Sequence, residues 1–181
     1  LGQVRPAWLH EEHQLLLREQ ADRVTRFVED LDAARDRAAV TQEELGNRLS
    51  DGLRRYVGDL NRLYGDYPAL HELDCSPNGF SWIDADDSDH SIYTYCRYSR
   101  GGDLLIVVLN FTPVVRDAHR IGVPFPGEWR VILNSDAGVY GGSNVGNAGR
   151  VAAEEVGAQG RPWSLSLALP PLATLYLQRS D

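Results

Sequence analysis

Two histidines stand one helical turn apart in the run His10-Glu11-Glu12-His13. Positions i and i+3 share a face of a helix, so the two imidazoles would form part of a ligand set for zinc. A third ligand would still be needed, either Glu12 or a carboxylate from another chain. Surface histidines without a ligand are the simpler interpretation. The sequence therefore predicts no metal site and no cofactor.

Two pairs of adjacent carboxylates, Glu43-Glu44 and Glu154-Glu155, are unsuited to joint catalysis. Neighbouring residues diverge on a helix and lie on opposite faces of a strand, so solvated surface is expected. Four further carboxylates gather in one short stretch: Asp84, Asp86, Asp87 and Asp89. The stretch lacks the glycine and the final glutamate of a calcium loop. A tight polar turn is the expected structure.

Aromatic side chains offer a different chemistry, because their faces can stack on sugar rings. The candidates are Trp82, Tyr93, Tyr95, Trp129, Tyr140 and Trp163. A β-sandwich uses the same residue types in its core and in cross-strand pairs. We expect core packing for Trp129 and for whichever of Tyr93 and Tyr95 points inward.

The overall composition excludes several classes of partner. The 181 residues carry a net charge of −8, which disfavours a nucleic acid. The chain contains no apolar run of the roughly 20 residues that cross a membrane, so no membrane partner is expected. Cys75 and Cys96 have no metal-type spacing. Two reduced thiols in a cytoplasmic protein are the expected state.

The first part of the chain must be helical. Apolar residues recur with a 3.5-residue repeat at Leu17, Val24, Phe27, Leu31, Ala34 and Ala38. This repeat predicts one helix over about residues 7–39 with an apolar seam. Thr41-Gln42-Glu43-Glu44 resembles a capping box, which marks either a new helix or a turn of a continuing one. The seam must be buried against the rest of the chain or against another copy, which makes a homo-oligomer an open alternative.

After Pro68 the period changes to two, with short apolar runs separated by turn residues. Eight strands are predicted, over residues 80–84, 91–98, 104–111, 119–121, 129–134, 149–152, 164–168 and 172–178. Strands this short at this spacing indicate an antiparallel sandwich. Residues 104–109 are apolar on both faces, so they should form a central strand.

The second part of the chain contains a series of distinctive motifs, which follow one another in this order: Asp59-Leu60-Asn61-Arg62-Leu63-Tyr64, Gly79-Phe80-Ser81-Trp82-Ile83, Asn110-Phe111-Thr112-Pro113-Val114, Gly127-Glu128-Trp129-Arg130, Tyr140-Gly141-Gly142-Ser143-Asn144-Val145-Gly146-Asn147 and Leu165-Ser166-Leu167-Ala168-Leu169-Pro170-Pro171. These motifs and their order carry a resemblance to the C-terminal end of bacterial 1,4-α-glucan (glycogen) branching enzymes. It implies the last helix of a catalytic (β/α)8 barrel, followed by a β domain of the α-amylase C-terminal type.

Such enzymes move α-1,4-glucan segments onto α-1,6 branches by a retaining mechanism with two carboxylates. In the family these carboxylates lie on barrel strands, so the resemblance implies no catalytic residue in this chain and no activity alone. The loop with Phe80 and Trp82 lies nearest the barrel in the family plan, which makes these two the sugar-binding candidates. Asn144 and Asn147 are added as possible hydrogen-bonding partners, although glycine-rich turns offer a structural explanation for their loop. An α-glucan is thus the expected ligand, if there is one.

Residues 1–51 contain the charged runs Arg18-Glu19-Gln20-Ala21-Asp22-Arg23 and Arg35-Asp36-Arg37-Ala38-Ala39-Val40. Through these runs they resemble a different family, the long cytoplasmic helix of CorA-like zinc transporters of the ZntB type. The sequence predicts a chimera with a junction near residues 50–52, and its lack of methionine is typical of a cut or processed chain. A cytoplasmic transporter fragment remains an alternative.

The expected fold class is α+β, with a long N-terminal helix or helical hairpin followed by an antiparallel β-sandwich. The expected domains are a helical segment over 1–67, of which 52–67 is the last barrel helix, and an all-β domain over 68–181. Without the barrel, one face of the β domain should be apolar and open. We expect the helices or a second chain to cover part of that face.

Overall fold

The computed structural model describes residues 7–180, and within this range the side chains of residues 22, 25–26, 28–39 and 41–180. The chain divides into two compact units, residues 1–47 and residues 48–181. The predicted boundary at residue 67 is not the boundary of these units, and as a limit of a family domain it stays a prediction.

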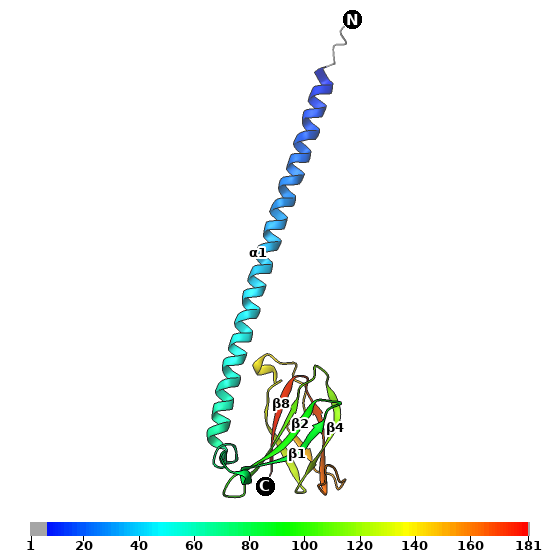
Figure 1. Ribbon diagram of the computed structural model, residues 1–181. Coiled ribbons are helices and arrows are strands. Elements are labelled where there is room, and N and C mark those ends of the chain that lie inside the picture. Colours follow the sequence, from blue (N-terminus) through cyan, green and yellow to red (C-terminus); the bar gives the residue numbers. More distant parts are fainter. Residues whose placement is uncertain (1–6, 181) are drawn as a thin grey trace. The chain divides into compact units, whose positions relative to one another are not determined.

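One helix, α1 (Ala7–Asp66), precedes all the strands (Figure 1). The hydroxyl of Thr41 donates a hydrogen bond of 2.9 Å to the carbonyl oxygen of Arg37, one turn earlier. That bond belongs to the interior of a helix, where Thr contacts its own preceding turn, and not to an N-terminal cap. The helix therefore continues through Thr41, and the helical hairpin is excluded.

The helix ends where proline forbids its continuation. The residue before a proline is pushed out of the helical region, and Tyr67 accordingly has extended backbone angles of φ −114° and ψ 99°. A short 3-10 turn, η1 (Pro68–Leu70), follows, and a second one, η2 (Pro77–Gly79), leads into the first strand.

All eight predicted strands are present, with their ends shifted by a few residues. They are β1 (Phe80–Asp87), β2 (Ile92–Tyr98), β3 (Leu104–Asn110), β4 (Arg116–Val123), β5 (Glu128–Asn134), β6 (Arg150–Ala152), β7 (Trp163–Leu169) and β8 (Ala173–Arg179). A 3-10 turn, η3 (Gly138–Tyr140), lies between β5 and β6.

The strands form two antiparallel sheets. The larger sheet has the order β1-β2-β3-β8-β5-β6, and the smaller one pairs β4 with β7. Strand β3 is central, as predicted, and its residues Leu105, Ile106, Val107 and Val108 are each no more than 1% exposed. A strand covered on both faces needs such a continuous apolar run.

The core lies between the two sheets. Ile92, Cys96 and Ile106 of the larger sheet pack there with Ile121 and Leu167 of the smaller one. We call this side of the larger sheet its inner face and the opposite side its outer face. The expected sandwich is confirmed.

The end of α1 covers part of the outer face. Leu63 is only 7% exposed, and together with Leu60 it lines a cavity of about 410 Å³ whose other wall includes Tyr95 and Tyr176. The prediction that a helix covers part of this face is therefore confirmed for the last turns of α1.

Candidate functional site

Five aromatic side chains form a continuous cluster at the β1 edge of the larger sheet. They are Phe80, Trp82, Tyr93, Tyr95 and Phe111, and we call them the aromatic strip. The ring centroids of Phe80 and Trp82 are 4.9 Å apart, those of Trp82 and Tyr95 are 5.9 Å apart, and those of Tyr93 and Phe111 are 5.7 Å apart. These are contact distances for aromatic pairs, so the strip is one surface.

Strand register assembles the strip. Trp82 of β1 lies opposite Tyr95 of β2, and residues opposite each other in an antiparallel pair share a face. Tyr93 and Tyr95 are two positions apart on β2, so they also share that face. The expectation that one of the two would point inward was wrong, because neither belongs to the core cluster between the sheets.

Exposure divides the strip into a rim and a base. Trp82 is 52% exposed and Phe111 is 57% exposed, whereas Tyr95 is half-buried. Burial raises the pKa of the Tyr95 phenol, and the charge of Arg97 opposes that change. The rim thus offers flat apolar faces to a ligand, and the arrangement suits binding and not acid–base chemistry.

The sequence interpretation did not include Phe111 among the stacking candidates. It follows β3 directly, at the turn that Asn110 organises by accepting hydrogen bonds from the backbone and the hydroxyl of Thr112. The backbone N–H of Phe111 donates to the carbonyl oxygen of Ser91, which places it beside the start of β2. Only this long-range pairing brings its ring to Tyr93, so no local signal could have identified it.

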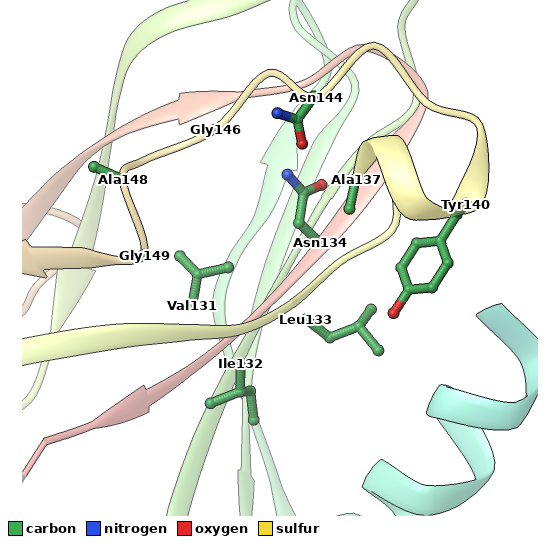
Figure 2. A pocket seen from close by; sticks show the side chains of 10 residues that line it. All are labelled: Val131, Ile132, Leu133, Asn134, Ala137, Tyr140, Asn144, Gly146, Ala148 and Gly149. Atoms are coloured by element: carbon green, nitrogen blue, oxygen red, sulfur yellow. The ribbon is translucent and has the colours of Figure 1, made fainter. Parts of the chain in front are cut away.

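The glycine-rich loop forms a second candidate site. With the end of β5 it encloses a pocket of about 450 Å³ (Figure 2). Apolar side chains of Val131, Ile132 and Leu133 line the pocket together with Asn134 and Asn144. The size is that of a small-ligand site, so the engagement of its polar groups decides what it can bind.

The two asparagines predicted as ligands in this loop, Asn144 and Asn147, already have partners within the protein. The side-chain oxygen of Asn144 accepts a hydrogen bond from the backbone N–H of Gly138. The amide of Asn147 both donates to the carbonyl oxygen of Ala168, at 2.9 Å, and accepts from its N–H, at 2.6 Å. Both asparagines therefore hold the loop in place, and their role as sugar ligands stays a prediction.

Asp136 provides the main support of this loop. Its carboxylate accepts hydrogen bonds from the backbone N–H and hydroxyl of Ser143 and from the N–H of Val145. Asn144 between them has a φ of 62°, a left-handed conformation that Asn adopts more readily than most residues. The loop is thus a preorganised element of the fold.

Tyr140 joins the same loop to the end of α1. Its ring lies edge-on to that of Tyr56, with centroids 5.3 Å apart, and its hydroxyl donates a 2.7 Å hydrogen bond to Asp59. Figure 2 shows this side chain directed toward the helix. Burial and the bond to Asp59 raise the pKa of Tyr140 to about 12, so the phenol keeps its proton and remains a donor.

The helix approaches the loop closely only because residue 52 is a glycine. A β-carbon at Gly52 would lie 2.2 Å from the carbonyl oxygen of Tyr140, which is far inside contact distance. Tyr140 was a candidate for stacking on a sugar ring, but in the structure its side chain contacts the helix instead.

The remaining candidates lie apart from the aromatic strip. Trp129 is fully buried, as predicted. Asp84, Asp86 and Asp87 lie in β1, and only Asp89 lies in the turn that follows, so the tight turn expected for this run covers only its end. Asp84 and Asp87 accept hydrogen bonds from the backbone N–H groups of Asp86 and His90, and Asp87 also bonds the imidazole of His90 at 2.7 Å. Glu154 is half-exposed and pairs with Arg120.

Side chains of the His10-Glu11-Glu12-His13 run lie outside the described residues, so its surface role stays a prediction.

Comparison with known proteins decides the family. Residues 82–180 match the family described as alpha amylase, C-terminal all-beta domain. The chain belongs to this family. The resemblance derived from the motifs is thereby confirmed for the β domain, which contains the aromatic strip and the glycine-rich loop.

The similar proteins are bacterial enzymes with the name 1,4-alpha-glucan branching enzyme GlgB. Over 127 residues the chain is 55% identical to the enzyme of Pseudomonas putida, and over 126 residues it is 56% identical to that of Cereibacter sphaeroides. The enzyme of Burkholderia vietnamiensis is 52% identical over 126 residues. Each alignment covers 70% of this chain and 17% of the relative, so the chain corresponds to a small part of those proteins.

The resemblance to the C-terminal part of branching enzymes is therefore confirmed. Within residues 7–180 there is one α-helix and there are eight strands, and these do not make a (β/α)8 barrel. None of the helical residues that the structure describes forms a stretch long and apolar enough to cross a membrane. The similarity of residues 1–51 to a transporter helix stays a prediction.

Proposed function

We propose that this alpha-amylase C-terminal domain braces the catalytic part of a 1,4-alpha-glucan branching enzyme and does not form branches by itself. The supporting observations are the 55% identity to the Pseudomonas putida enzyme over 127 residues and the family match over residues 82–180. The outer face of the larger sheet fits this role, because it keeps exposed aromatic residues such as Trp82 and Phe111 beside a helix end that packs on it. An exposed apolar surface of this kind is typical of a face that meets another part of a protein.

The chemistry of the site supports a non-catalytic role. A retaining transfer needs two carboxyl groups about 5–5.5 Å apart, one of them free to attack a sugar. Three carboxylates around the two candidate sites have structural partners within the protein. Asp136 holds the glycine-rich loop, Asp59 accepts from Tyr140, and Asp74 pairs with Arg97.

A cytoplasmic location belongs to the same proposal. Cys75 is an exposed free thiol and Cys96 is a buried one, a state that reducing compartments maintain.

The first test is an assay of the chain alone on amylose, with α-1,6 linkages counted after debranching. We expect no linkages above background, with the Pseudomonas putida enzyme as the active reference. New branches formed by the chain alone would overturn the non-catalytic role.

The second test asks whether the domain can brace a barrel. The matched segment of the Pseudomonas putida enzyme is replaced by the corresponding residues of this chain. The hybrid should be soluble and should branch amylose at a rate comparable to the parent. A hybrid that is folded by circular dichroism yet inactive, or one that cannot be obtained soluble, would contradict the proposal.

A second function, weak contact with α-glucan, is favoured by the aromatic strip. Trp82, Tyr93 and Phe111 are exposed and adjacent, and aromatic faces of this kind can stack on the apolar faces of glucose units. Phe80 and Trp82, predicted from the sequence as sugar ligands, both belong to the strip.

This function is tested by titrating the chain with maltoheptaose and following tryptophan fluorescence and heat. We expect weak saturable binding that Trp82→Ala abolishes. Phe125→Ala is the matched control, because Phe125 is 47% exposed but contacts Arg179 away from the strip. Flat titrations, or equal binding by the two variants, would exclude the strip as the binding surface.

A further inference from the structure

The described part of the first unit, residues 7–47, is helical, and none of its described side chains is buried. Every described side chain from residue 22 to residue 47 is exposed. The large apolar ones, Val28, Leu31 and Leu45, are 49%, 53% and 54% exposed. Isolated helices gain little from propensity alone and are stabilised mainly by burying an apolar stripe. This stripe therefore needs an occupant.

The spacing of the stripe is that of a two-stranded coiled coil. Leu31, Ala34, Ala38, Thr41 and Leu45 follow one another at intervals of three, four, three and four residues, all on α1. This alternation keeps one seam in line over several turns and favours a second helix as the partner. The hydroxyl of Thr41 is satisfied by the carbonyl oxygen of Arg37, so it requires no partner across the seam.

The charges beside the seam select the kind of helix that fits. With Leu31 and Leu45 at the first position of the heptad, Asp30 and Arg35 lie on opposite edges of the seam, five residues apart. In a parallel, in-register pair of identical helices, this places Asp30 of each copy against Arg35 of the other. One heptad later, the equivalent pair is Arg37 of one copy and Gln42 of the other. Because Gln42 is uncharged, no like charges meet there.

An antiparallel pair would not have this complementarity. Each edge of the seam would then face the same edge of the other copy, so Asp30 and Arg35 would no longer meet.

We propose that residues 28–45 of α1 form a parallel, in-register, two-stranded coiled coil with a second copy of this chain. The proposal concerns the helix and is independent of the function of the β domain.

Sedimentation equilibrium with Leu31→Asp tests the seam. The unaltered chain should show a mass of twice the 20.2 kDa of one copy, and Leu31→Asp should reduce the measured mass to that of the monomer. Ala33→Asp is the matched control, because residue 33 lies off the seam on the same exposed helix, and this variant should stay dimeric. A monomer at high concentration for the unaltered chain, a larger oligomer, or equal effects of the two variants would overturn the proposal.

Cysteine cross-linking tests the direction and register without relying on a disruptive change. In a Cys75→Ser background, Ala34→Cys lies on the seam and should give a disulfide-linked dimer on mild oxidation. Asp36→Cys lies on the opposite face and should remain monomeric on a denaturing gel. Cross-linking of both variants alike, or of Asp36→Cys alone, would contradict a seam at these positions.

A charge swap separates the parallel from the antiparallel arrangement. Asp30→Arg should weaken dimerisation by about tenfold, because it replaces two attractive contacts with two repulsive ones. Adding Arg35→Asp should restore the original affinity by recreating the pairs with opposite sign. If the second substitution fails to restore affinity, the parallel in-register arrangement is wrong.

Discussion

The two ends of α1 both carry apolar residues at helical spacing, but their side chains have different surroundings. From residue 22 to residue 47 all described side chains are exposed, although Leu31 and Leu45 continue the apolar stripe. From residue 48 onward Leu63 is buried, Tyr56 contacts Tyr140, and Asp59 accepts a hydrogen bond from the Tyr140 hydroxyl. An apolar stripe thus predicts that a helix needs a partner, but it does not name the partner.

The two regions of α1 should differ most in the free energy of unfolding that is lost when a leucine is replaced by alanine. Leu63→Ala removes a side chain that is 7% exposed and should lower the free energy of unfolding of the β-domain unit by about 3 kcal/mol. Leu31→Ala, at a 53% exposed position, should change it by less than about 0.5 kcal/mol. Urea unfolding followed by tryptophan fluorescence, at protein concentrations that keep the chain monomeric, measures both. Equal effects would erase the distinction between the two ends of the helix.

Replacing a glycine by alanine should lower stability at Gly52 and raise it at Gly46. Gly52→Ala forces a methyl group to within 2.2 Å of the Tyr140 carbonyl oxygen and should destabilise the unit by about 2 kcal/mol, because backbone must move. Urea unfolding of this variant checks the loss. A neutral or stabilising result would show that the helix does not pack against the loop at this position.

Removal of the Tyr140 hydroxyl should lower the free energy of unfolding by less than Gly52→Ala does, and the loss should depend on pH. Tyr140→Phe loses the bond to Asp59 and should cost about 1 kcal/mol at neutral pH. The folded pKa is raised from 10.0 to about 12, so the bond stabilises fully below pH 10 and its contribution disappears as pH rises through 12. The difference in unfolding free energy between the two proteins, measured from pH 7 to pH 11.5, should narrow only above pH 10. A difference that is constant across this range, or that narrows on acidification, would contradict the role of the protonated phenol.

The smallest expected change is a gain of stability. Gly46→Ala meets no atom within 4 Å and replaces a poor helix former with the best one. We expect the helix to become more stable by about 0.5–1 kcal/mol, measured by circular dichroism at 222 nm during thermal unfolding. A loss of stability would indicate that residue 46 makes a close contact.

Most of the fold could be predicted from local patterns. The change from helical to alternating periodicity near Pro68 identified both the helix and the eight strands, because side-chain period and backbone geometry are linked locally. The continuous apolar run of β3 also predicted a central strand, since only a strand covered on both faces uses such a run.

Less of the candidate site could be predicted. Phe80 and Trp82 were recognised through a motif. Tyr93 was left open between a stacking residue and a core residue, and Phe111 was not considered as a stacking residue. Asn147 was named as a possible sugar ligand beside a structural explanation for its loop, and only the structure shows that its amide is engaged with the backbone of Ala168, 21 residues away. Contacts between distant segments depend on register and loop path, which single-residue preferences do not encode.

The sequence by itself determined the types of the elements, the identity of the core strand and the family, because these depend on local spacing and on motifs. Tertiary structure alone decided which residues of α1 are buried, which asparagines are engaged and which aromatic rings share a surface. Tyr140 illustrates the reason. Its partners Tyr56 and Asp59 lie about eighty residues earlier, and only the glycine at position 52 allows the two segments to approach.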